Sequence, residues 1–164
     1  MEWLRYSIRL VLVIPLQVLL IDQLQWLGIV HPQIYILCLL MLPIRMPQWA
    51  DMLIGAALGL VMDIYANSLG MHISACVAIM YFRRLLIPRF VSESERISGD
   101  ICSGSIGTIA MWQMTGILVL IHHLMIGILS AWSFAHFGMT ILSILVSSLI
   151  SFLLIIGYDK IHSA

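Results

Sequence analysis

The sequence has very little charge and almost no continuous polar stretch. Charged residues make up 10% of the 164 positions, hydrophobic residues make up 62%, and the mean hydropathy is +1.06. The longest polar interval, ESERISGD at residues 93–100, is too short to fold as an extramembrane domain. A soluble domain of this size has too little interior to bury so much apolar surface. The composition therefore predicts one all-α, polytopic membrane domain over residues 1–164, without an attached ATPase or catalytic module.

The sequence also has no formal net charge and few cysteines. The formal net charge is zero, which gives no basis for a nucleic-acid partner. Three scattered cysteines, Cys38, Cys76 and Cys102, show no CxxC spacing, so neither a disulfide framework nor a zinc site is indicated. At the N-terminus, no small-residue cleavage site follows the first apolar run, which we interpret as an uncleaved span.

Apolar runs of roughly 20 residues mark candidate membrane spans. Six are predicted, near residues 5–24, 32–45, 48–66, 70–90, 101–130 and 135–158. The second run is short, and the motif MLPIRMP at its end supplies Pro43 and Pro47, which break a helix and favour a tight turn. Interpreting 32–66 as one bent segment would give five spans instead.

In the six-span arrangement, every second loop between spans lacks Lys and Arg. This absence favours six spans over five. With six spans, all eight basic residues fall on one side of the membrane: Arg5, Arg9, Arg45, Arg83, Arg84, Arg89, Arg96 and Lys160. Cytoplasmic loops carry the excess of Lys and Arg. The pattern predicts a compact six-helix bundle with both termini in the cytoplasm.

The third predicted span carries a stripe of small residues that ends in a carboxylate. Gly55, Gly59 and Asp63 recur every four residues, so they share one helical face. Glycines allow a neighbouring helix to approach closely. We expect Asp63 to be a hydrogen-bonding anchor that ties the turn to the fourth span, with Asn67 offering local hydrogen bonds and Gly70 permitting the turn geometry.

A second stripe lies in the sixth predicted span, where Ser143, Ser147 and Ser151 recur at the same spacing. Such small-residue patterns are frequent in membrane helices. We interpret this stripe as ordinary packing within the bundle.

The sequence offers weak candidates for chemistry. No nucleophile elbow is present, because SGSIG lacks the first glycine of GxSxG. His122 and His123 are adjacent and point about 100° apart on a helix, which disfavours one shared metal or haem. Asp22 and Asp63 lie near the outer ends of their spans, and we expect no other acid within a span, which disfavours proton-coupled transport. We therefore predict no enzyme, and no catalytic, cofactor or metal residues.

A longer pattern resembles a known family. The run GLVMDIYANSLGMHISA, preceded by PQIYILCLLMLP, is similar to the rod shape-determining protein MreD family. Its most recognisable feature is GLxxD followed by LG. The matching positions here are Gly59, Leu60, Asp63, Leu69 and Gly70, and Asn67-Ser68 replaces the Gly-Ser-Pro type of step that many relatives have.

The resemblance implies a non-enzymatic scaffold of the bacterial cell-elongation machinery in the inner membrane. It implies binding to the single-span protein MreC and work alongside MreB, RodA and the elongation penicillin-binding transpeptidase. It also implies a six-helix fold similar to the substrate-binding subunits of energy-coupling-factor transporters. The alternative function is therefore a small-molecule, vitamin-like binding subunit, although the short outer loops favour the scaffold.

Overall fold

The computed structural model describes residues 2–22, 29–93, 106–131 and 137–163, and within these ranges the chain is helical without a β-strand. Its elements are α1 (Glu2–Leu16), the π-helix η1 (Gln17–Ile21), α2 (Ile36–Leu40), α3 (Gln48–Ala66), α4 (Met71–Phe90), α7 (Thr108–Ser130) and α8 (Phe137–Ser163). Four of the described helices, α3, α4, α7 and α8, are long and apolar enough to cross a membrane. The prediction of an all-helical protein is confirmed for the described residues, and the six predicted crossings stay a prediction.

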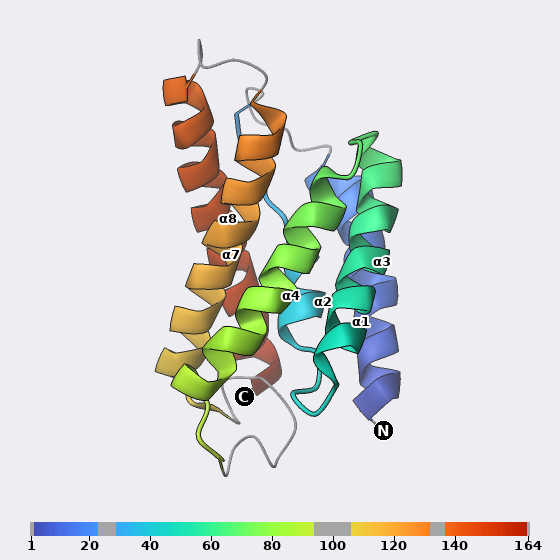
Figure 1. Cartoon of the computed structure of the whole chain (residues 1–164), viewed down its shortest axis with the longest axis vertical. Helices are drawn as coiled ribbons and strands as arrows, with labels where there is room; N and C mark the ends of the chain where they lie inside the picture. The colour runs from blue at the N-terminus through green and yellow to red at the C-terminus, as the bar shows by residue number, and fades with distance from the viewer. Residues whose placement is uncertain (1, 23–28, 94–105, 132–136, 164) are drawn as a thin grey trace.

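The long helices pack in chain order, α3 against α4, α4 against α7, and α7 against α8. Helix α1 with η1 lies at one side of the bundle, and the short α2 lies in the middle (Figure 1). Helix α1 begins and α8 ends at the same end of the bundle (Figure 1). We call this end, which also holds the turn at residues 43–47, the inner end, and the end with the α3–α4 turn the outer end.

The second predicted span needs correction. Residues 32–45 do not form a helix of membrane-spanning length, because α2 covers only Ile36–Leu40 and turns flank it. Figure 1 nevertheless shows this stretch descending from the outer to the inner end through the middle of the bundle. Residues 35–40 are 0% exposed. The run is apolar because protein surrounds it on all sides, and an apolar run alone does not distinguish that environment from lipid.

The other predicted boundaries differ by a few residues. The third span, 48–66, coincides with α3, and the fourth, 70–90, begins one residue before α4. In the first span Pro15 lies inside α1, and the π-helix η1 follows it directly. The last predicted span ends at residue 158, whereas α8 continues to Ser163. Predicted residues 23–24, 101–105 and 135–136 lie outside the described ranges.

The core lies around residues 29–46, which we call the central segment, rather than between two long helices. Apolar side chains from α1, α3, α4 and α7 pack on it, among them Val13, Met62, Ile79 and Met114. Helix α8 is peripheral, since its described side chains are exposed or only partly buried apart from one face that includes Ser147, Ser151 and Ile155. An apolar helix that remains this exposed is typical of a membrane span.

Candidate functional site

The run that resembles the MreD signature builds the hairpin of α3 and α4 at the outer end. The Asp63 carboxylate accepts hydrogen bonds from the backbone N–H groups of His72 and Ile73, both at 3.0 Å, and from the Ser68 hydroxyl at 2.6 Å. His72 and Ile73 lie in the first turn of α4, whose N–H groups have no partner within the helix. Asp63 therefore caps α4 from the last turn of the preceding helix.

The turn between the two helices uses two residues in the left-handed region. Asn67 ends α3 with a φ of 51°, and Gly70 precedes α4 with a φ of 82°. Asn is among the few residues with a side chain that adopt this conformation readily, and Gly adopts it without steric cost. These two backbone angles turn the chain so that the first turn of α4 faces Asp63.

The glycines of the stripe lie against α4. A Cβ atom added at Gly59 would lie 2.6 Å from the Ile73 Cα atom and 2.7 Å from the His72 carbonyl oxygen. One added at Gly55 would lie 2.8 Å from a side-chain carbon of Met80. Gly59 therefore allows the closest approach of the two helix backbones. Gly55 meets the flexible Met80 side chain first, and the Cys76 carbonyl oxygen lies 3.2 Å from the added atom.

The two leucines of the signature are different. Leu60 is 50% exposed and Leu69, in the turn, is 97% exposed. Neither is needed to fill the interior of this chain. The seven predicted residues thus separate into those that shape the hairpin and those that face outward from it.

The serine stripe of α8 holds the non-helical residues 29–33. The Ser143 hydroxyl donates to the Ile29 carbonyl at 2.5 Å. The backbone N–H groups of His31 and Gln33 donate to the hydroxyls of Ser147 and Ser151 at 2.9 and 2.8 Å.

Geometry explains why a spacing of four on the helix matches a spacing of two on the segment. Four helical residues rise about 6 Å and two extended residues about 6.6 Å, so the two periods nearly coincide. The stripe that we expected to be ordinary packing therefore supplies hydrogen-bond partners to a buried, non-helical backbone.

Gln17 of η1 completes the outer part of this segment. Its side-chain oxygen accepts from the Ile34 N–H at 2.7 Å, and its amide donates to the Pro32 carbonyl at 3.0 Å and to the Asp22 carboxylate at 2.6 Å. Gln17 is 0% exposed. Asp22 is consequently held in place at the end of η1, next to residues 31–34.

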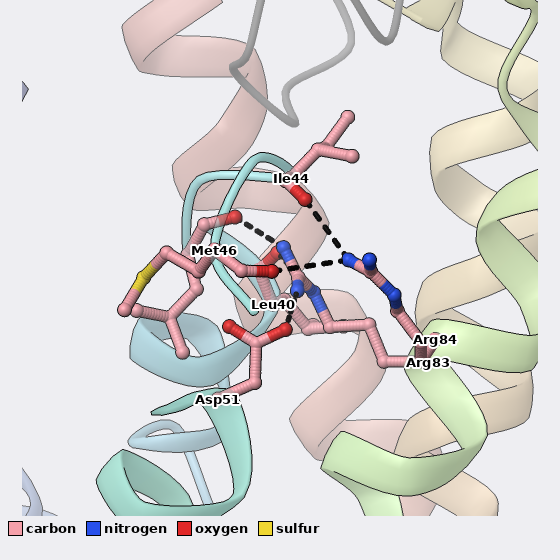
Figure 2. Close-up of polar contacts among 7 residues, drawn as sticks. Leu40, Ile44, Met46, Asp51, Arg83 and Arg84 are labelled. Carbon is pink, nitrogen blue, oxygen red and sulfur yellow. Dashed lines mark hydrogen bonds and ion pairs between the residues drawn. The ribbon is translucent and has the colours of Figure 1, made fainter. Parts of the chain in front are cut away.

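Two arginines of α4 hold the inner part of the segment (Figure 2). Arg83 donates to the carbonyls of Leu40 and Leu42, and Arg84 donates to those of Ile44 at 3.0 Å and Met46 at 3.2 Å. Four alternate carbonyls are thus bound by two neighbouring guanidinium groups.

Arg83 also meets an acid that the sequence analysis missed. Its Nη1 lies 3.5 Å from the Asp51 carboxylate, and both side chains are almost fully buried. We had expected no acid other than Asp22 and Asp63 within a span, and this is wrong because Asp51 lies in the first turn of α3. No sequence signal joins two residues 32 positions apart, although a charged residue inside an apolar span indicates that a partner is needed.

The histidines take part in two separate hydrogen-bonded groups. The Tyr35 hydroxyl lies 2.8 Å from His72 Nδ1 and 2.7 Å from His122 Nε2. His123 instead lies 2.9 Å from the Val119 carbonyl and 3.3 Å from the Ser151 hydroxyl. His122 and His123 therefore point to different partners. Within the described ranges, no group of three or more His, Cys, Asp or Glu residues is arranged to hold a metal ion.

An open cavity of about 950 Å³ lies at the outer end, bounded by η1, the segment 29–33 and the outer parts of α3, α4, α7 and α8. Its lining is mixed, with apolar side chains such as Met62 and Ile126 beside Asp22, His31, Gln33 and Ser147. This volume is in the range of small-molecule sites. It is a candidate ligand site within the described part of the chain.

The fold and these contacts define an all-helical protein whose four long apolar helices surround a central, hydrogen-bonded, partly non-helical segment. Comparison with protein-family models, with curated proteins and with solved structures found no match. A proposal for the function of this chain therefore rests on its own residues.

Proposed function

We propose that this protein is a non-enzymatic membrane scaffold of the bacterial cell-elongation complex, with the role of an MreD family member. In this proposal it lies in the inner membrane with its inner end toward the cytoplasm, and its chain crosses the membrane six times, as in the substrate-binding subunits of energy-coupling-factor transporters. It binds MreC directly, and MreB, RodA and the elongation transpeptidase belong to the same assembly.

The observation that carries the proposal is that residues of the GLxxD…LG run have two different structural roles. Gly59, Asp63 and Gly70 each meet a requirement of the α3–α4 hairpin, namely close approach, capping and a left-handed turn. Leu60 lies within the apolar span α3, where lipid covers an exposed leucine, whereas Leu69 is 97% exposed in the turn at the outer end. A protein partner, such as MreC in its single span, gives the Leu69 side chain a role.

The polar groups of the interior also favour a scaffold. Asp63, Ser147, Ser151, Arg83 and Gln17 all bind backbone groups of this chain. Side chains that hold the fold together in this way are not free to act on a substrate. In this account they keep a rigid bundle for partners to bind.

Depletion of the protein in its native, rod-shaped host tests the proposal. We expect the cells to become round, and MreC to co-purify with the tagged protein from native membranes. Leu69→Ser should lower MreC recovery several-fold. The level of folded protein should stay unchanged, because Leu69 makes no contact that the fold needs. The matched control is Leu129→Ser, which changes another exposed leucine at the outer end, in α7, and should leave MreC recovery unchanged. Normal rod shape after depletion would contradict the proposal.

A second candidate function is a small-molecule binding subunit of a membrane transporter. The outer cavity of about 950 Å³ favours it, because such a subunit needs a site open to the outside. Saturable, high-affinity binding of a vitamin-like compound to the purified protein, together with normal cell shape after depletion, would support this candidate over the scaffold.

A further inference from the structure

The outer cavity combines polar groups in a way that indicates the chemistry of an occupant. Its most strongly polar member is Asp22, whose carboxylate is positioned by the 2.6 Å hydrogen bond from Gln17. Gln17 is itself anchored to Pro32 and Ile34. The carboxylate is therefore fixed before any ligand arrives, and preorganisation of this kind lowers the cost of binding.

Gln33 adds a second acceptor to the lining. It is 7% exposed, its backbone N–H is bound to Ser151, and its side-chain carbonyl oxygen has no hydrogen-bond partner. A buried carbonyl without a donor is costly, so such groups in proteins usually have a partner. A ligand with N–H groups would supply the missing donor after a small rotation of the side chain.

Lys and Arg are missing from the described part of the same lining, which contains the histidines His31, His72 and His123. Phosphate or carboxylate groups are typically bound by Arg, Lys or helix N-termini. At the N-terminus of α4, the N–H groups of His72 and Ile73 are already bound by Asp63, so the fixed Asp22 carboxylate favours a cation over an anion. Quaternary ammonium groups are typically bound by several aromatic rings, whereas Tyr65 is the one Phe, Tyr or Trp among the described lining residues.

The geometry points to a binding site for a primary ammonium group in this cavity, with Asp22 as counter-ion, Gln33 as a hydrogen-bond acceptor and the apolar wall around Met62 and Ile126 beside the rest of the ligand. The group belongs either to a free small amine or to the headgroup of an aminophospholipid. The inference rests on the cavity of the second candidate function and adds the ligand class to it, and it does not depend on the scaffold role.

Two matched ligand pairs test the assignment on the purified full-length protein in detergent. Ethanolamine and choline differ in their N–H donors, and so do lysophosphatidylethanolamine and lysophosphatidylcholine. We expect the primary amine of at least one pair to bind ten times or more tightly than its quaternary partner, as measured by isothermal titration calorimetry or native mass spectrometry. Saturable ethanolamine binding identifies a free amine as the source, and preference within the lysolipid pair alone identifies the lipid headgroup.

Variants then locate the site. Asp22→Asn keeps an acceptor for Gln17 but removes the charge, and it should weaken binding of the preferred amine at least tenfold. Ile126→Trp narrows the cavity from the α7 side while Gln17 and Asp22 stay unchanged in sequence, and it should also weaken binding. Glu93→Gln removes an exposed carboxylate at the inner end and should leave binding unchanged.

Equal affinities within both ligand pairs would overturn the inference, as would unchanged binding in both cavity variants. These results are separable from failure of the second candidate function. A vitamin-like compound without an ammonium group that saturates the cavity would leave that function standing and refute the ligand class. Amine binding in the cavity without any uptake defect in depleted cells would support the ligand class and refute the transporter function.

Discussion

The outer and inner parts of the central segment have their backbones satisfied by opposite kinds of side chain. At the outer end, neutral hydroxyls of α8 and the amide of Gln17 bind residues 29–34. At the inner end, Arg83 and Arg84 of α4 bind the carbonyls of residues 40, 42, 44 and 46. A non-helical stretch inside an apolar bundle is therefore possible where side chains replace the missing helical hydrogen bonds.

The hydroxyl and guanidinium partners of the backbone also differ in how many side chains are needed and in the free energy of burying them. A hydroxyl is neutral and binds one or two groups, so three serines and a glutamine are needed for the outer part. A guanidinium has five donors, so two arginines are enough for four carbonyls. Burying Arg83 requires a counter-charge, and Asp51 supplies it. Loss of one side chain should consequently matter more at the inner end than at the outer end.

The largest effect is expected for Arg83→Leu. It leaves the Asp51 carboxylate buried without a partner and removes the donors to Leu40 and Leu42, a loss of about 3–5 kcal/mol. We expect little folded protein, measured by fluorescence-detected size-exclusion chromatography and by the melting temperature in detergent. Arg89→Leu, in the last turn of the same helix but exposed, is the control and should behave like the wild type. A stable Arg83→Leu protein would remove the basis for the comparison.

A smaller effect is expected at Asp63, the carboxylate that caps α4 at the outer end. Asp63→Leu removes the acceptor of two backbone N–H groups and should cost roughly 1–3 kcal/mol. Asp63→Asn keeps one acceptor oxygen in place of two, so we expect a melting temperature between those of the wild type and the leucine variant. Equal loss of cell shape in both variants at normal protein levels would show that the charge of Asp63 is functional rather than structural.

The smallest effects are expected in the serine stripe. Ser151→Ala removes the acceptor of the Gln33 N–H, and we expect a destabilisation of about 1 kcal/mol. Combining Ser147→Ala with Ser151→Ala should add a similar amount, because each serine binds a different backbone group. Ser148→Ala is the matched control, since its hydroxyl bonds to the Leu145 carbonyl of its own helix. If the double variant melts like the Ser148 control, the stripe is ordinary packing after all.

The sequence predicted the parts of the fold whose boundaries have local causes. Helix α3 is bounded by Pro47 and by the left-handed Asn67, and both residues have strong local preferences. The turn at Gly70 follows from the same kind of local preference. The prediction of the hairpin rests on these local preferences together with the hydrogen-bonding capacity of Asp63, and it needs no resemblance to a family.

The central segment was not predictable in the same way. Hydropathy reports that residues 35–42 avoid water, but it does not report whether lipid or protein surrounds them. Arg83 was counted as a basic residue near a loop because its partners, Asp51 and two carbonyls, are far away in sequence. The spacing of the serines was visible, yet their partners are backbone groups, which every sequence has in common. The cavity at the outer end is likewise formed by elements that only the tertiary fold brings together.

Side-specific labelling of the central segment tests most directly the claim that it runs from one face of the membrane to the other. In a chain with Cys38, Cys76 and Cys102 replaced by alanine, His31→Cys and Arg45→Cys place one thiol at each end of the segment, and restoring Cys38 alone places one in the middle. With a membrane-impermeant maleimide, the account predicts labelling of position 31 in spheroplasts, of position 45 in inside-out vesicles, and of Cys38 in neither. Labelling of positions 31 and 45 from the same side would show that the segment enters and returns, and would contradict the account.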